Sequence, residues 1–274
     1  MIPASFDYVR ASTADEAVQR LSEAGEDAKL LAGGHSLLPL MRLRMATPSL
    51  LVDIGGMRDL SYVKDGGDSL AIGALTRHGE LARNELARRE APLLAHVAGQ
   101  VGDPQVRHRG TIGGSIAHGD PASDLPAACL ALGASFVTAS PRGEQTRSAD
   151  EFFTGFLETA LAPDEMLVEI RVPKSAGATW SFQKFNRRAQ DWAIVGVALA
   201  RNGSTRIGLV NMGATPLRAT AAEDALAGGA SPAEASSRAG DGLAPPSDLS
   251  ASAEYRRHLA RVLVRRALEE AVAG

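Results

Sequence analysis

Two short segments with adjacent glycines and flanking hydroxyl side chains could bind a phosphate group. Glycine has no Cβ, so such segments can present consecutive backbone N–H groups to an anion, an arrangement suited to a diphosphate. Neither segment matches the dinucleotide-binding fingerprint G-x-G-x-x-G or contains the G-K-[ST] of a P-loop. A single Gly-Gly segment is more often a plain turn. Two such segments with hydroxyl partners shift the balance toward a phosphate site, and they leave the ligand open. The first segment consists of Ala32, Gly33, Gly34, His35 and Ser36, and the second of Thr111, Ile112, Gly113, Gly114 and Ser115.

Polar residues directly after the second segment offer further contacts. Asp120 and Asp124 could accept hydrogen bonds from sugar or ribityl hydroxyls, cap the N-terminus of a helix, or do both. We expect no metal here, although His118 and the two carboxylates are residue types that metals bind. In the first segment, His35 could be a covalent attachment point for a flavin, a general base, or a hydrogen-bonding partner of backbone or phosphate. No Ser–His–Asp triad follows from the spacing of these residues.

The single cysteine, Cys129, excludes several kinds of site. No disulfide can form within the chain, and neither an iron–sulfur cluster nor a zinc ion can be held by four thiolates. Cys129 lies in the apolar run 125–132, which favours a buried structural thiol over a nucleophile.

Composition and charge describe an ordinary globular protein. The 274 residues allow one large domain or two modest ones, and 45% of them are hydrophobic. The 29 basic and 32 acidic residues give a net charge of −3, which argues against a surface that coats nucleic acid. The N-terminus has neither a basic region nor a long apolar stretch, and Pro, Gly and Ser interrupt the longest uncharged run, 125–141. We therefore expect a soluble cytoplasmic protein without a signal peptide or a membrane-spanning segment.

Helices and strands alternate irregularly through the first part of the chain. The sequence Thr13-Ala14-Asp15-Glu16 matches a capping box, which marks the start of a helix, and Gly25 is a typical helix stop. Together they predict a helix over 14–24. A short apolar run over 29–32 leads into the first glycine segment, and the second is expected to be a glycine-dense loop. Further strands are predicted at 50–54, 61–63, 70–72 and 136–138, and helices at 76–83, capped by Thr76, at 92–101 and at 125–132.

The pattern changes after a strand predicted at 167–173. Residues 174–177 are typical of a link between domains, and Asn202-Gly203 predicts a tight hairpin turn. We therefore expect an α+β protein with domains at 1–175 and 176–274. The second domain is predicted to contain strands at 180–185, 192–201 and 205–214 and helices at 219–227, 231–238 and 252–272.

Two strings carry a resemblance to a known family. AGGHSLLPLMRLR at 32–44 and RGTIGGSIAHGDPASDLPA at 109–127 resemble the FAD-binding medium subunit of molybdenum hydroxylases, a family that includes carbon monoxide dehydrogenase and xanthine dehydrogenase. The likeness extends from 6–25 to 254–268. It implies a two-lobed FAD-binding domain of the vanillyl-alcohol-oxidase (PCMH) type. A small α+β C-terminal domain with an antiparallel sheet and helices is expected to follow.

The resemblance also assigns roles by position. Both glycine segments are expected to wrap the FAD pyrophosphate, and Asp124 to bind the cofactor's polyol or ribose. Leu167 is expected to pack beside the flavin, and Lys184 to lie near the carbonyl edge of the isoalloxazine. Trp192 occupies a position where the family often has an aromatic residue covering the ring; a core aromatic on a strand is the alternative. His108 departs from the family pattern, which has Asn there.

The resemblance finally implies an electron-transfer subunit that contributes no catalytic residue of its own. Noncovalent FAD is expected here, while a small subunit carries two [2Fe–2S] clusters and a large subunit carries molybdopterin, in a dimer of heterotrimers. An external acceptor, which could be NAD, a quinone or oxygen, would take the electrons. The alternatives are a self-sufficient FAD-dependent oxidase of the same fold and a nucleotide-binding regulatory module without redox activity.

Overall fold

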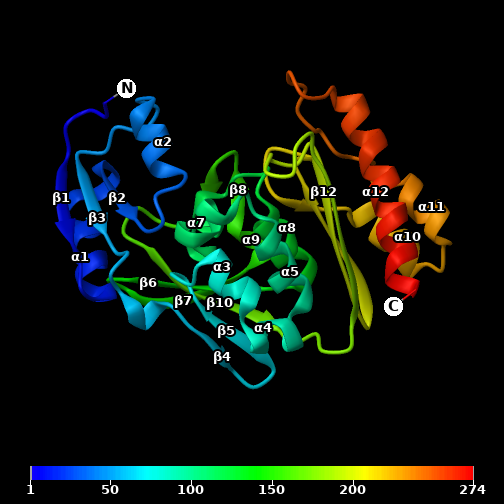
Figure 1. Cartoon of the computed structure of the whole chain (residues 1–274), viewed down its shortest axis with the longest axis horizontal. Helices are drawn as coiled ribbons and strands as arrows, with labels where there is room; N and C mark the ends of the chain where they lie inside the picture. The colour runs from blue at the N-terminus through cyan, green and yellow to red at the C-terminus, as the bar shows by residue number, and fades with distance from the viewer. Residues whose placement is uncertain (1, 274) are drawn as a thin grey trace.

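A computed structural model describes residues 2–273, which form three lobes in chain order (Figure 1). The N-terminal lobe is a parallel three-stranded sheet in the order β1-β3-β2, with the helix α1 packed against it. The Thr13 hydroxyl accepts the N–H of Glu16 at 3.2 Å, so the predicted start of α1 is confirmed. The elements are β1 (Asp7–Arg10), α1 (Ala14–Ala24), β2 (Ala28–Leu31), α2 (Leu37–Arg42) and β3 (Leu50–Asp53).

The middle lobe is an antiparallel sheet in the order β4-β5-β10-β6-β7, covered on one side by helices. Its core joins Leu70 and Ile72 of the sheet to Leu93, Leu94 and Ile112 of the helices. The strands are β4 (Val63–Asp65), β5 (Ser69–Gly73), β6 (Ser135–Ser140), β7 (Gly143–Ser148) and β10 (Met166–Pro173), with a small hairpin of β8 (Phe153–Gly155) and β9 (Glu158–Thr159). The helices are α3 (His78–Arg83), α4 (Glu85–Glu90), α5 (Pro92–Gln100), α6 (Pro104–Arg109), α7 (Ile112–His118), α8 (Asp124–Leu132) and α9 (Ala149–Phe152).

The C-terminal lobe is an antiparallel four-stranded sheet with its own helices on one face, and its other face packs against α5 and α8 of the middle lobe (Figure 1). Alternate residues of a strand face opposite sides, so Val197 and Leu199 pack toward α12 while Ala198 and Ala200 join the core around α8. The elements are β11 (Thr179–Phe185), β12 (Val195–Asn202), β13 (Ser204–Val210), β14 (Leu217–Arg218), α10 (Thr220–Ala227), α11 (Pro232–Ser237) and α12 (Ala253–Ala273). Of the helices within 2–273, none is long and apolar enough to cross a membrane.

Two local predictions were wrong because contacts distant in sequence decide the conformation. Thr76 does not cap α3: its hydroxyl binds the backbone N–H and C=O of Tyr62, and Arg77 precedes the helix. The second glycine segment is a helix, α7, rather than a loop. The buried side chains of Ile112 and Ile116 supply packing that outweighs the poor helix propensity of its two glycines. The helices α2, α4 and α6, each of six residues, were not predicted.

Gly208 lets the C-terminal sheet lie directly against α8. A methyl group added to this glycine would overlap the carbonyl group of Ala127, whose carbon would be 2.8 Å away. The contact joins β13 to the helix that begins at Asp124, so any displacement here also changes the middle lobe.

Gly208→Val is therefore expected to lower the free energy of unfolding by about 1–3 kcal/mol, the usual cost of overpacking a core. Urea denaturation measures the change. Gly228→Ala is the matched control, because the added methyl meets only ordinary contacts at 3.5 Å. Equal stability of the two variants would contradict the close packing described for Gly208.

Candidate functional site

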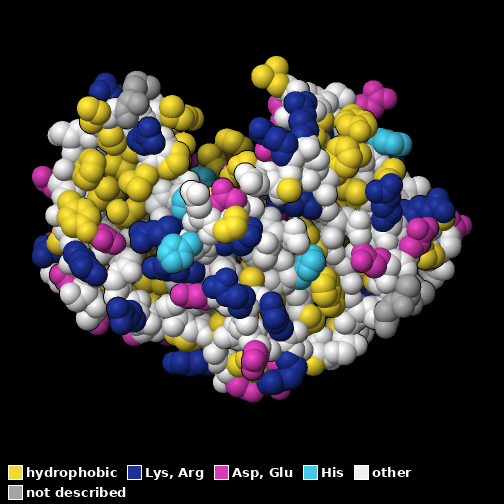
Figure 2. Space-filling model, viewed as in Figure 1, with side chains coloured by type: hydrophobic (Ala, Val, Ile, Leu, Met, Phe, Trp, Pro, Cys, Tyr) yellow, Lys and Arg dark blue, Asp and Glu magenta, His cyan; other side chains and the backbone are white. Residues whose placement is uncertain are grey.

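A cleft of about 980 Å³ lies where the three lobes meet, and each lobe contributes to its lining. The space-filling view shows the surface hollowed between the N-terminal and C-terminal lobes (Figure 2). The volume is at the upper end of the range of about 300–1,000 Å³ that is usual for sites of small molecules and cofactors. The cleft can therefore take an extended ligand that touches all three lobes.

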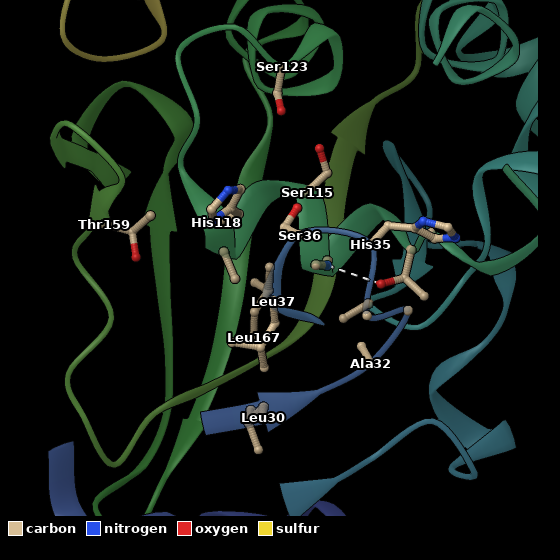
Figure 3. Close-up of a pocket in the computed structure, with 18 of the residues that line it drawn as sticks. Leu30, Ala32, His35, Ser36, Leu37, Ser115, His118, Ser123, Thr159 and Leu167 are labelled. Atoms are coloured by element: carbon tan, nitrogen blue, oxygen red, sulfur yellow. Dashed lines mark hydrogen bonds between the residues drawn. The ribbon is translucent and has the colours of Figure 1, made fainter. Parts of the chain in front are cut away.

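All but two of the predicted site residues line this cleft. Figure 3 shows Ser36 and Ser115, which belong to different glycine segments, in the same part of it, with Leu167 nearby. Leu167 lies at an irregularity of β10, where the pairing with β6 shifts register. The predicted residues that line the cleft are Ala32, Gly33, Gly34, His35, Ser36, Thr111, Gly113, Gly114, Ser115, Asp124, Leu167, Lys184 and Trp192.

Ile112 and Asp120 lie outside the lining, contrary to expectation. The Ile112 side chain is fully buried in the core of the middle lobe, and its N–H donates to the Thr76 carbonyl oxygen at 3.0 Å. The Asp120 carboxylate accepts the N–H of Ala122 at 2.8 Å and fixes the turn that precedes α8. Neither Asp120 nor Asp124 caps this helix, because Ser123 occupies the N-cap position and Asp124 is the first helical residue.

The first glycine segment presents unbonded backbone donors. It connects β2 to α2, and within the described chain the N–H groups of Gly33, Gly34, His35 and Ser36 donate to no protein acceptor. Gly34 has φ +78°, a left-handed conformation that favours glycine. Gly33, Gly34 and Ser36 are half-buried and His35 is exposed. Because half-buried amides normally find partners, this row of free donors is well placed to bind an anionic ligand.

The second glycine segment differs from the first, because its amides already have partners. Gly113 N–H donates to the Ala74 oxygen at 2.8 Å, and the N–H groups of Gly114 and Ser115 donate to the Thr111 hydroxyl and carbonyl oxygens. A methyl on Gly113 would lie 2.5 Å from the Ala74 Cβ. This segment thus provides close packing and the Ser115 side chain, which lies in the cleft (Figure 3), rather than a row of free amides.

The first glycine segment touches the backbone directly before the second one. A methyl on Gly33 would lie 2.5 Å from the Arg109 carbonyl oxygen and 2.9 Å from the Gly110 Cα. His78 lies next to this contact, and its backbone N–H donates to the Gly110 carbonyl oxygen at 3.0 Å. No sequence pattern pointed to His78, because its place in the cleft wall depends on this hydrogen bond to Gly110, which is distant in the chain.

The His78 imidazole is 4% exposed, and its Nδ1 has no hydrogen-bond partner among residues 2–273. Burial, together with the nearby His35 and Arg107, lowers the pKa of His78 to about 4. At neutral pH this side chain is therefore uncharged, and His78 is one of the residues that line the cleft.

Lys184 and Asp124 form a buried ion pair between the C-terminal and middle lobes. Lys184 Nζ lies 2.6 Å from Asp124 Oδ2 and also donates to the Gln100 carbonyl oxygen at 3.2 Å. Burial raises the pKa of the Asp124 carboxyl, while the Lys184 charge and hydrogen bond oppose that rise. The second oxygen, Asp124 Oδ1, has no partner within the described residues, so it is free to accept a hydrogen bond from a ligand.

Trp192 lies at the edge of the cleft in the segment between β11 and β12. Its side chain is 58% exposed, so the alternative of a core aromatic on a strand is wrong. Cys129, in contrast, is fully buried in α8, and burial raises the pKa of its thiol to about 12. Across residues 2–273, no three His, Cys, Asp or Glu side chains gather closely enough to hold a metal ion.

Comparison with protein families identifies the family of this chain. The model described as "FAD binding domain in molybdopterin dehydrogenase" matches residues 4–175, and "CO dehydrogenase flavoprotein C-terminal domain" matches residues 180–271. The chain belongs to the FAD-binding medium subunits of the carbon monoxide dehydrogenase and xanthine dehydrogenase family. The α+β fold predicted from the resemblance, with a two-lobed FAD-binding part followed by an antiparallel sheet and helices, is confirmed.

Individual members of this family are similar over their whole length. The carbon monoxide dehydrogenase medium chain of Hydrogenophaga pseudoflava is 43% identical, with 99% of this chain and 98% of that protein covered. Subunit alpha of the 6-hydroxypseudooxynicotine dehydrogenase complex of Paenarthrobacter nicotinovorans is 38% identical, with 99% and 96% covered. A structure of the Hydrogenophaga pseudoflava carbon monoxide dehydrogenase that lacks the Mo-pyranopterin moiety has a TM-score of 0.95 and 44% identity, over 100% of this chain and 99% of that one.

The residues of the cleft fit the cofactor of this family. FAD has a diphosphate, hydroxyls on its ribityl and ribose parts, and a flat apolar ring system. The cleft offers the unbonded amides around Gly33, the free Asp124 Oδ1, and the apolar side chains of Leu167 and Trp192. Donors, acceptors and apolar surface are thus all available to such a ligand within one cleft.

Substituting either tightly packed glycine should remove the cofactor. A Val side chain at Gly33 would overlap the backbone of Arg109 and Gly110, and one at Gly113 would overlap Ala74, so both purified variants are expected to contain little FAD. The ratio of flavin absorption to protein absorption measures the loss. Gly99→Ala is the control, since its methyl would meet only Ala82 at 3.7 Å. Normal FAD content in both Val variants would reduce these segments to ordinary turns.

The buried His78 should make the stability of the FAD-free protein depend on pH. Unfolded His78 takes up a proton near pH 6.5, whereas folded His78 does so only near pH 4, so the unfolded state binds more protons between these values. The stabilisation is complete above about pH 6.5 and is lost as the pH falls toward 4. Between pH 7 and pH 5 the wild type should lose about 2 kcal/mol more than His78→Gln, measured by urea denaturation at both pH values. Parallel losses in the two proteins would contradict the low pKa of His78.

Proposed function

We propose that this chain passes electrons from iron–sulfur clusters of a partner subunit, through noncovalently bound FAD, to an external acceptor. The observation that carries the proposal is the row of four unbonded amides, Gly33 to Ser36, in a three-lobed cleft of a member of this flavoprotein family. Backbone amides bind a diphosphate without a covalent bond, and they require no catalytic side chain. Bound FAD supplies the redox chemistry, since flavins accept and donate electrons.

In this proposal, different residues of the cleft bind different parts of FAD. The amides of Gly33 to Ser36 hold the diphosphate, with the Ser115 side chain beside them, and Asp124 Oδ1 accepts a hydrogen bond from a polyol or ribose hydroxyl. Leu167 packs beside the ring system. Trp192 covers one face of the ring. In this division the FAD-binding domain spans 1–175 and the flavoprotein C-terminal domain 176–274.

Lys184 supplies a cation near the carbonyl edge of the flavin, with its charge balanced by Asp124. A buried ammonium without a partner would be costly, so the 2.6 Å ion pair keeps the lysine charged in a position enclosed by two lobes. Because one carboxylate oxygen is bound to Lys184 and the other is free, Asp124 serves both the lysine and the cofactor.

The electrons must come from another polypeptide in this proposal. An iron–sulfur cluster needs four protein ligands, usually thiolates, and the sequence contains one cysteine, which is fully buried. The buried carboxylates of the cleft are also engaged: Asp124 pairs with Lys184, and Glu165 accepts bonds from Arg147 and the Ala162 N–H. We therefore place two [2Fe–2S] clusters in a small subunit and molybdopterin in a large one, assembled as a dimer of heterotrimers.

The substrate of the complex is not determined by this chain. Relatives named for carbon monoxide and for 6-hydroxypseudooxynicotine are 43% and 38% identical to it, although their substrates are chemically unrelated. This pattern supports a substrate site on the large subunit and a common electron-transfer role for the medium subunit.

Two measurements test the proposal. Acid precipitation of the purified protein should release a yellow, fluorescent compound that runs as FAD, leaving a colourless precipitate. The chain expressed alone and loaded with FAD should not bleach anaerobically when substrates are added, whereas the complex with its partner subunits should bleach and should contain iron and molybdenum. Colour retained by the precipitate would indicate a covalent link. Rapid bleaching of the isolated chain would favour a self-sufficient oxidase.

A further inference from the structure

The segment 186–194, which we call the rim segment, carries Trp192 to the edge of the cleft. It connects β11 to β12, and Ile194 N–H donates to the Phe185 oxygen at 2.8 Å, which closes the segment at its base. The Trp192 side chain is 58% exposed, so packing of its own ring does not hold it in place. Its position must therefore come from the backbone of the rim segment.

A fully buried arginine holds one end of this backbone. Arg256 of α12 is 0% exposed; its guanidinium donates to the Ile194 carbonyl oxygen and, at 2.7 Å, to Asp248 Oδ2. The neighbouring carbonyl of Ala193 accepts a bond from Asn211 at 3.1 Å. Both residues that directly follow Trp192 are thus fixed by side chains from elsewhere in the C-terminal lobe.

The loop that carries Asp248 is tied to the rim segment a second time. Asp248 Oδ1 accepts the N–H groups of Ser250 and Ala251 at 2.8 and 3.1 Å, which closes a tight turn. From within the rim segment, Arg187 donates back to the carbonyl oxygens of this same turn, Leu249 and Ser250, at 3.3 and 3.4 Å. The turn and the rim segment therefore brace each other through two arginines.

Stability alone is a poor reason for this arrangement. Arg256 Nε is buried without a partner among the described residues, and its ion-pair partner Asp248 is half-exposed, so the charge of the buried guanidinium is only partly compensated. The pair does fix geometry, because a guanidinium is planar and can bind a carbonyl and a carboxylate at the same time. The hydrogen bonds of Arg256 to Ile194 and Asp248 therefore hold the rim segment rigid.

We propose that Arg256 and Asp248 are positioning residues that hold the rim segment so that Trp192 stands over the cleft. The inference rests on the proposed function, in which the cleft holds FAD and Trp192 covers its ring. Arg256 and Asp248 act through the backbone of Ile194 and through the turn at Ser250, and neither lines the cleft.

The test uses the full chain in a Trp180→Phe background, where Trp192 is the sole tryptophan. Asp248→Asn is the main variant, because this side chain is half-exposed and its substitution should leave a folded protein. Arg256→Met is the stronger variant. Asp241→Asn and Arg257→Met are matched controls. Asp241 pairs with Arg261 of α12, and Arg257 binds the Leu243 carbonyl, but neither contacts the rim segment.

In FAD-free protein, Asp248→Asn should lower the fluorescence anisotropy of Trp192, and neither control should. In FAD-loaded protein, Asp248→Asn should raise flavin fluorescence toward that of Trp192→Leu and weaken FAD binding about tenfold, or about 1.4 kcal/mol. Flavin fluorescence and FAD affinity of Trp192→Leu are measured in parallel with those of the wild type. Adding Asp248→Asn to Trp192→Leu should change the flavin signal no further, because the effect passes through Trp192.

A lower melting temperature with unchanged Trp192 and flavin signals would make the pair merely structural and overturn the inference. Flavin effects of Asp248→Asn that persist in full on the Trp192→Leu background would overturn it too. If the wild type binds no FAD, the proposed function fails separately, and the anisotropy of Trp192 in the FAD-free protein still decides the positioning role.

Discussion

The backbone of Gly33 lies against the backbone of Arg109 and Gly110, and the cleft depends on this contact between the N-terminal and middle lobes. Without a side chain at Gly33, the chain that follows β2 can pass close to the end of α6 and keep its own amides free. A Cβ there would push the two lobes apart, and the donors of Gly34 to Ser36 would move with them. The free amides of the first glycine segment thus depend on Gly33, because only a residue without a Cβ lets the two lobes approach so closely.

The third lobe joins this arrangement by charge and by close packing. The Lys184–Asp124 pair links β11 to α8, and Gly208 lets β13 lie on the same helix. Because α8 begins at Asp124, the contacts that dock the C-terminal sheet also fix the carboxylate that faces the cleft. The same contacts with α8 therefore dock the C-terminal lobe and form one wall of the cleft.

Three buried side-chain atoms lack hydrogen-bond partners within the described chain: His78 Nδ1, Asp124 Oδ1 and Arg256 Nε. Folded proteins pair nearly all such atoms, so each exception calls for an explanation. His78 and Asp124 line the cleft, and Arg256 holds the segment that carries Trp192. In the proposed function, two of the three unpaired atoms therefore belong to residues beside the cofactor, and the third belongs to the arginine that positions Trp192.

The sequence by itself determined the elements with strong local signals. The Thr13 cap marks the start of α1, and the Asn202-Gly203 turn joins β12 to β13. The glycine pairs mark both segments of the cleft. Lys184 and Trp192 were found only through family resemblance, since nothing local distinguishes them. Tertiary structure alone decided that the first glycine segment has free amides while the second, at Gly113, is bonded to Ala74. It also decided that His78 and Arg256 are buried beside or behind the cleft, because burial and hydrogen-bond partners depend on residues far apart in the chain.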